Sequence, residues 1–110
     1  MSLLASLTAE LQRLGERGET IGYGELARRL AVPGPGSVAT LTRALEDLMA
    51  EDARAGRSFL ASVCTAKLGN GLPARGFFEA AIRLGRYSGS CDGPEASAFI
   101  AAERAALLVR

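Results

Sequence analysis

The stretch Val32-Pro33-Gly34-Pro35-Gly36 constrains this chain most, because two prolines and two glycines so close together cannot continue a helix. Leucines recur with helical spacing on both sides of it. Leu26 and Leu30 fall on one face of a short segment before the stretch, and Ser37 is a suitable N-cap for a segment that extends to about Arg54. The sequence therefore predicts two helices joined by a sharp turn.

A third amphipathic helix comes before these two. Ser2 is a suitable N-cap for it, and Gly15 or Gly18 can end it. Its expected inward positions are Leu3, Leu4, Leu7, Leu11 and Leu14. Those of the helix after the turn are Val38, Leu41, Leu45, Leu48 and Met49. Three packed helices are therefore expected in the first half of the chain.

After Gly56 the hydrophobic pattern changes. Residues 58–68 carry little charge and many apolar side chains, which is typical of a buried strand, and Gly69-Asn70-Gly71 is a strong tight-turn signal. Residues 72–78 would return as a second, irregular strand, followed by two turns of helix to Leu84. After a loop, Pro94 would begin a last helix that ends near Val109.

This order predicts an α+β, mostly helical fold: a winged helix-turn-helix with a β-hairpin and two extra C-terminal helices, in a single domain over residues 1–110. No stretch approaches the roughly 20 apolar residues of a membrane span, and Met1 opens no basic leader segment. We expect no membrane partner and a reduced, cytoplasmic location, with Cys64 a buried free thiol and Cys91 more exposed.

The composition excludes several kinds of chemistry. The chain has no histidine, so a Ser-His-Asp triad, a Cys-His dyad and a His-containing zinc site are ruled out within one chain. The neighbouring carboxylates Glu46-Asp47 and Glu51-Asp52 would point about 100° apart on a helix, so neither pair converges on a metal or a substrate. We expect no catalytic residues, no metal and no cofactor.

One segment resembles a known family. The resemblance is to the helix-turn-helix of alkylguanine-DNA alkyltransferases and alkyltransferase-like proteins. It rests on Tyr23-Gly24-Glu25-Leu26-Ala27-Arg28-Arg29-Leu30, then Pro33-Gly34 and Arg43-Ala44-Leu45, and covers less than a quarter of the chain. The segment from Gly71 to Phe78, with Leu84-Gly85-Arg86, resembles a run found in bacterial proteins. The resemblance implies a DNA-binding helix-turn-helix in which Tyr23 occupies the place of the family's nucleotide-rotating tyrosine.

The chain also departs from that family. The spacer between the two helices is longer, and Ser37 and Val38 fall where the family keeps the arginine that fills the vacated base position. Cys64 lies at about the right distance for the reacting cysteine, but no histidine stands beside it to generate a thiolate. Alkyl transfer is therefore not expected. We expect Tyr23 to cover the helix junction, with its hydroxyl on a polar partner.

The net charge is only +1, so an anionic partner would be attracted by a local group of basic residues and not by the charge of the whole molecule. The first hypothesis is a non-catalytic protein that docks the Ser37 end of a helix on double-stranded DNA. Its predicted nucleic-acid-binding residues are Arg28, Arg29, Ser37, Thr40, Arg43, Lys67 and Arg75. Acidic residues in the second half of the same helix would repel phosphate.

The alternative hypothesis is a protein-interaction adaptor or self-associating module with the same fold and no nucleic acid. Its predicted partner-binding residues are Glu51, Asp52, Phe77, Phe78 and Arg86. A small-molecule ligand is a third option. The sequence leaves the partner, the DNA sequence and the oligomeric state open, a homodimer included.

Overall fold

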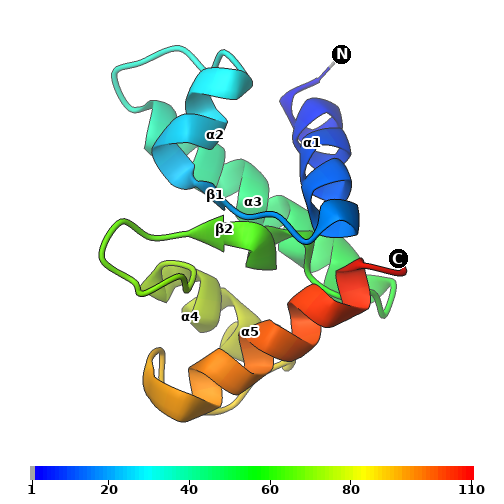
Figure 1. Ribbon diagram of the computed structural model, residues 1–110. Helices are drawn as coiled ribbons and strands as arrows, with labels where there is room; N and C mark the ends of the chain where they lie inside the picture. Colours follow the sequence, from blue (N-terminus) through cyan, green and yellow to red (C-terminus); the bar gives the residue numbers. More distant parts are fainter. Residues whose placement is uncertain (1) are drawn as a thin grey trace.

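The leucine-rich first half forms three helices. In the computed structural model, which describes residues 2–110, these are α1 (Leu3–Arg17), α2 (Tyr23–Arg29) and α3 (Ser37–Arg54) (Figure 1). The Ser2 hydroxyl caps α1 by accepting a hydrogen bond from the backbone N–H of Ala5 at 3.1 Å. Gly18 ends the helix with a positive φ of 69°. Residues 31–36 form the predicted turn. The N-cap of α3 is Gly36 and not the predicted Ser37, which is the first residue of the helix and makes no capping hydrogen bond.

The second half is also mainly helical. A 3-10 helix, η1 (Leu60–Val63), leads into the short strand β2 (Cys64–Thr65), and α4 (Arg75–Arg83) and α5 (Gly93–Leu107) follow. Strand β2 pairs in parallel with β1 (Ile21–Gly22), with Ile21 opposite Cys64. The chain is thus a mostly helical α+β protein whose small sheet joins its two halves.

The predicted β-hairpin is wrong. Residues 58–68 were expected as one strand, but only Cys64 and Thr65 are extended within the sheet, and their partner lies 43 positions earlier. The second predicted strand, over residues 72–78, is instead a turn followed by the first residues of α4. The apolar run around Phe59 is short of charge because the core surrounds it, and its backbone hydrogen-bonds to side chains instead of a neighbouring strand.

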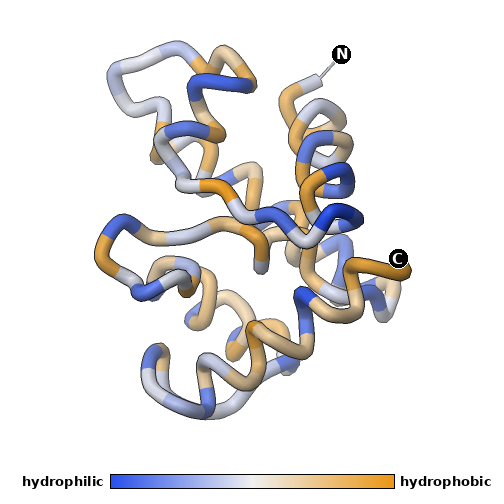
Figure 2. Tube along the Cα trace, in the orientation of Figure 1, coloured by the Kyte–Doolittle hydropathy of each residue, from blue (hydrophilic) through white to orange (hydrophobic). Residues whose placement is uncertain are grey.

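The core lies where α1, α3, η1 and α5 meet. Figure 2 shows hydrophobic residues along β1 and β2 at the centre of the molecule. Leu7, Leu11, Leu41 and Phe59 are completely buried there. Val38 departs from the prediction because its side chain is 45% exposed instead of facing the core. In the part of the chain that the structure describes, no helix is both long and apolar enough to cross a membrane.

Residues 59–63, here named the buried connection, run through this core between α3 and β2. Their backbone groups need partners because they are shielded from water. Asp52 accepts a hydrogen bond from the N–H of Leu60 at 3.1 Å, and Glu103 accepts one from the N–H of Phe59 at 2.8 Å. Arg104 donates to the carbonyl of Ser62 at 2.8 Å. Side chains of α3 and α5 therefore supply the hydrogen bonds that a neighbouring strand would otherwise provide.

Candidate functional site

Two of the predicted phosphate-binding residues are engaged in ion pairs. Arg29 contacts Glu10 on α1 at 2.8 Å and Glu25 on α2 at 2.9 Å. These contacts hold the pKa of Glu10 below its ordinary value, mainly through the hydrogen bond from Arg13 and then that from Arg29. Arg75 contacts Glu79, one turn later on α4, at 3.1 Å. Arg29 in particular links α1 to α2, which is a structural role.

The other three predicted basic residues carry no such partner. Within residues 2–110, Arg28, Arg43 and Lys67 form no ion pair, and all three are exposed. The guanidinium of Arg28 lies beside Gly24, one turn earlier on α2. Lys67 is in the loop after β2, which extends to the same side as the turn between α2 and α3 in Figure 1. We refer to Arg28, Arg43 and Lys67 as the unpaired cations.

The polar residues at the start of α3 differ in their surroundings. Ser37 is half-buried in the first turn. Thr40 borders a hollow that Leu3 and Ser6 of α1 also line, so Thr40 faces α1 and not the outer side of α3. No acidic residue stands in the first turn of α3, and no side chain caps it. This end of the helix therefore carries its positive partial charge without internal compensation.

The acidic second half of α3 is mostly neutralised. Glu46 faces Arg83 at 3.6 Å, and Glu51 contacts Arg54 at 2.9 Å. Asp52 is completely buried and accepts hydrogen bonds from Arg57 at 3.2 Å and from Arg110 at 2.9 Å. Of the four carboxylates, Asp47 alone has no ion pair within the described residues 2–110. The repulsion that these carboxylates would exert on phosphate is correspondingly small.

The predicted partner-binding surface is wrong at Asp52, Phe77 and Phe78, whereas Glu51 is exposed as that prediction requires. Asp52 and Phe78 have no exposed area, and Phe77 is only 6% exposed, with its ring edge-on to Phe59 and Phe78. Arg86 lies over the Phe59 ring at 4.4 Å and donates to the carbonyl of Arg57 at 2.9 Å. Asp52, Phe77, Phe78 and Arg86 instead stabilise the buried connection and the aromatic core.

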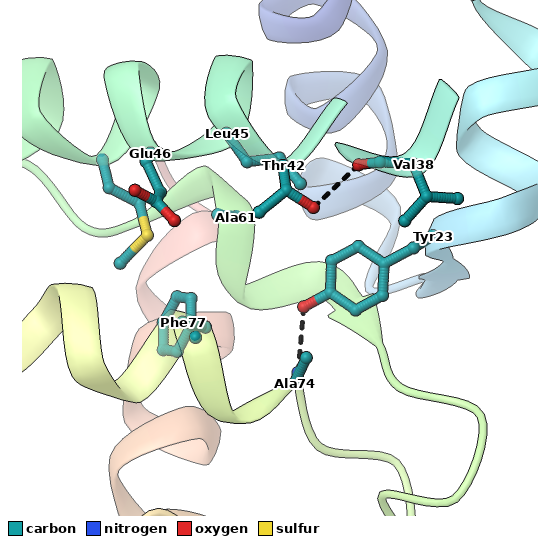
Figure 3. A pocket seen from close by; sticks show the side chains of 10 residues that line it. Tyr23, Val38, Thr42, Leu45, Glu46, Ala61, Ala74 and Phe77 are labelled. Carbon is teal, nitrogen blue, oxygen red and sulfur yellow. Dashed lines mark hydrogen bonds between the residues drawn. The ribbon is translucent and has the colours of Figure 1, made fainter. Parts of the chain in front are cut away.

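A cleft opens between α3 and α4 (Figure 3). Its volume is about 120 Å³. The lining residues are Tyr23, Val38, Thr42, Leu45, Glu46, Met49, Ala61, Ala74, Gly76 and Phe77. Most are apolar, and Figure 3 shows the carboxylate of Glu46 and the ring of Phe77 on opposite sides of the opening. This cleft was not predicted from the sequence, although positions 38, 42, 45, 46 and 49 have the spacing of one helical face.

Tyr23 forms one end of the cleft. Its hydroxyl oxygen accepts a hydrogen bond from the backbone N–H of Ala74 at 2.9 Å, and its ring packs against the core. Burial raises the pKa of Tyr23 to about 12, so its hydroxyl stays neutral at physiological pH. The expectation that this ring covers the helix junction with its hydroxyl on a polar partner is confirmed.

Neither cysteine forms a disulfide in the described chain. Cys64 is completely buried in β2, and Cys91 is partly exposed, as expected. Burial raises the pKa of the Cys64 thiol to about 12, with a smaller opposing effect from the charge of Arg104. Cys64 thus remains a protonated thiol that does not line the cleft.

Comparison of the chain with protein-family models, with curated proteins and with solved structures finds no match in any of the three. The function must therefore be argued from the arrangement of the unpaired cations, the start of α3 and the cleft.

Proposed function

We propose that the chain is a non-catalytic, winged-helix-like protein that binds duplex DNA. The outer side of the first half of α3 docks toward the major groove and places Arg43 on a phosphate at the groove edge. Arg28 on α2 and Lys67 in the loop after β2 contact flanking phosphates. Residues 66–73 take the place of a wing, as a closed turn in which the N–H of Ala66 donates to the carbonyl of Leu72 at 2.8 Å.

The distribution of ion pairs carries this proposal. Arg28, Arg43 and Lys67 have no carboxylate partner within residues 2–110, whereas three of the four acidic residues in the second half of α3 do. The backbone N–H groups at the start of α3, which no side chain caps, add a further attraction for phosphate oxygens.

The state of Cys64 supports a binding role over alkyl transfer. A thiol that is buried and protonated cannot act as a nucleophile toward a DNA adduct. Tyr23 likewise holds a structural hydrogen bond. The resemblance to the alkyltransferase helix-turn-helix then concerns recognition of the duplex and not the chemistry.

Measurement of duplex binding against salt concentration tests the proposal. Each phosphate contact contributes about −0.9 to the slope of log K on log salt, so three unpaired cations predict a slope near −2.7. Arg43→Ala should bring the slope closer to zero by about 0.9. A flat dependence, or no binding at low salt, would contradict the proposal.

Arg54→Ala is the matched control. Arg54 is exposed on the same helix, about 16 Å beyond Arg43, and pairs with Glu51. Its removal changes the net charge by the same amount and should leave the slope unchanged. Equal effects of the two substitutions would show that the protein responds to its total charge and not to contact at the start of α3.

A further inference from the structure

We propose that the cleft between α3 and α4 binds a small aromatic cation, with the ring in the apolar cavity and the ammonium group on Glu46. This proposal concerns a different surface from the unpaired cations and does not depend on DNA binding. Three properties of the cleft lead to it: its size, its charge and the weakness of its internal ion pair.

The size suits one aromatic ring. The cavity volume is about 120 Å³, of the same order as the roughly 150 Å³ of an enclosed cavity that holds benzene, and this cleft is open on one side. Leu45 and Ala61 line the inner side, and both side chains are buried. Val38 is 45% exposed, so the cavity opens to solvent beside an accessible apolar side chain. A ligand larger than one ring can extend outward there.

The charge of the cleft favours a cation. Glu46 is the one charged residue among the ten described residues that line it. Thr42 donates its hydroxyl proton to the carbonyl of Val38 at 2.8 Å, so its oxygen is left to act as an acceptor. The rings of Tyr23 and Phe77 add the negative potential of their faces. A carboxylate ligand would meet repulsion from Glu46.

The ion pair that occupies Glu46 is easily exchanged. Arg83 on α4 lies 3.6 Å from the carboxylate, and the two side chains are 63% and 42% exposed. Exposed pairs of this kind contribute little, because water solvates both partners. Elsewhere on α4, Arg75 and Glu79 pair with each other and do not compete. An ammonium group that brings a buried ring with it can therefore displace Arg83.

Benzylamine, benzyl alcohol and benzoate form a matched series of probes for this site. Each would be titrated into the full chain while methyl and amide NMR shifts of Val38, Ala61 and Met49 are followed. We expect saturable shifts with benzylamine at millimolar concentration. Benzyl alcohol should bind about threefold to tenfold more weakly, as for one partly exposed charge contact, and benzoate more weakly still.

Three variants then test which residues of the cleft are responsible for binding. Glu46→Gln should weaken benzylamine binding by about the same factor and leave benzyl alcohol unchanged, whereas Arg83→Gln should strengthen benzylamine binding. Gly76→Leu should abolish binding of both. A Cβ atom at Gly76 meets no atom within 4 Å, and leucine favours the helix more than glycine does, so this variant should stay folded.

The outcomes decide the proposal. Saturable, amine-selective shifts at the cleft that respond to Glu46→Gln and Arg83→Gln in opposite directions would support it. Equal binding of the three probes, shifts away from the cleft, no saturation, or benzylamine binding that survives Glu46→Gln unchanged would overturn it.

Discussion

The hydroxyl oxygen of Tyr23 accepts a hydrogen bond from the backbone N–H of Ala74 at 2.9 Å, across 51 positions of sequence. This contact ties the first residue of α2 to the residue before α4, and it lies at the edge of the cleft. It therefore couples the helix-turn-helix to the second half of the molecule immediately after β1, which ends at Gly22.

Substitutions at Tyr23 should separate the ring from the hydroxyl. Tyr23→Phe leaves the Ala74 N–H without its partner and should lower the free energy of unfolding by about 1–2 kcal/mol. Tyr23→Ala also removes the packed ring and should cost about 3 kcal/mol or more. Denaturant titration measures both. An unchanged unfolding midpoint for Tyr23→Ala would contradict the packing role.

Asp52 should be among the most sensitive positions on α3. Asp52→Ala removes the acceptor for Leu60 and leaves the guanidinium groups of Arg57 and Arg110 without their buried counter-charge. We expect a loss of about 3–5 kcal/mol in the free energy of unfolding. Asp47→Ala is the control, an exposed carboxylate on the same helix, and should change stability by less than about 0.5 kcal/mol. Similar losses for both would disprove the role of Asp52.

The two thiols should differ in reactivity. A thiol reagent at pH 8 should modify Cys91 in the native protein and spare Cys64, because Cys64 is buried and its pKa is raised to about 12. One thiol per chain should react under native conditions, and two should react in denaturant. Rapid native modification of both would mean that β2 opens readily.

Stability should depend on Glu10 at acid pH. The folded-state pKa of Glu10 lies below its ordinary value of 4.5, chiefly because Arg13 and Arg29 hydrogen-bond to its carboxylate. The stabilisation is therefore complete above the unfolded pKa and is lost as the pH falls through the folded pKa. The free energy of unfolding should fall over this range, and less steeply in Glu10→Gln.

Helix periodicity was a good guide to the first half of the chain. The leucine spacing and the Pro-Gly turn placed α1, α2 and α3 within a few residues, since amphipathic helices that border a core leave a regular signature. Val38 was the exception, because a position at the edge of the apolar stripe can face either the core or a cleft. Only the packing of α4 decides between them.

The second half was harder for a physical reason. An apolar run such as residues 58–65 indicates that the segment is buried but does not indicate its backbone conformation. Here the hydrogen-bond partners of its backbone are side chains from α3 and α5. The burial of Asp52 did have a signal, because it continues the spacing of Leu41, Leu45 and Leu48 on the core face. Together with Glu51 it was instead predicted to bind a partner. Which cations are unpaired depends on contacts between helices, which periodicity does not reveal.

The buried connection has a consequence for how the molecule opens. The N–H groups of Phe59 and Leu60 are held by Glu103 of α5 and Asp52 of α3, so neither helix can detach without exposing buried polar backbone. The helix-turn-helix is therefore not a separable module with an appended tail. The chain should lose its structure in one cooperative step, with the amide protons of Phe59 and Leu60 exchanging with solvent only as fast as the whole fold opens.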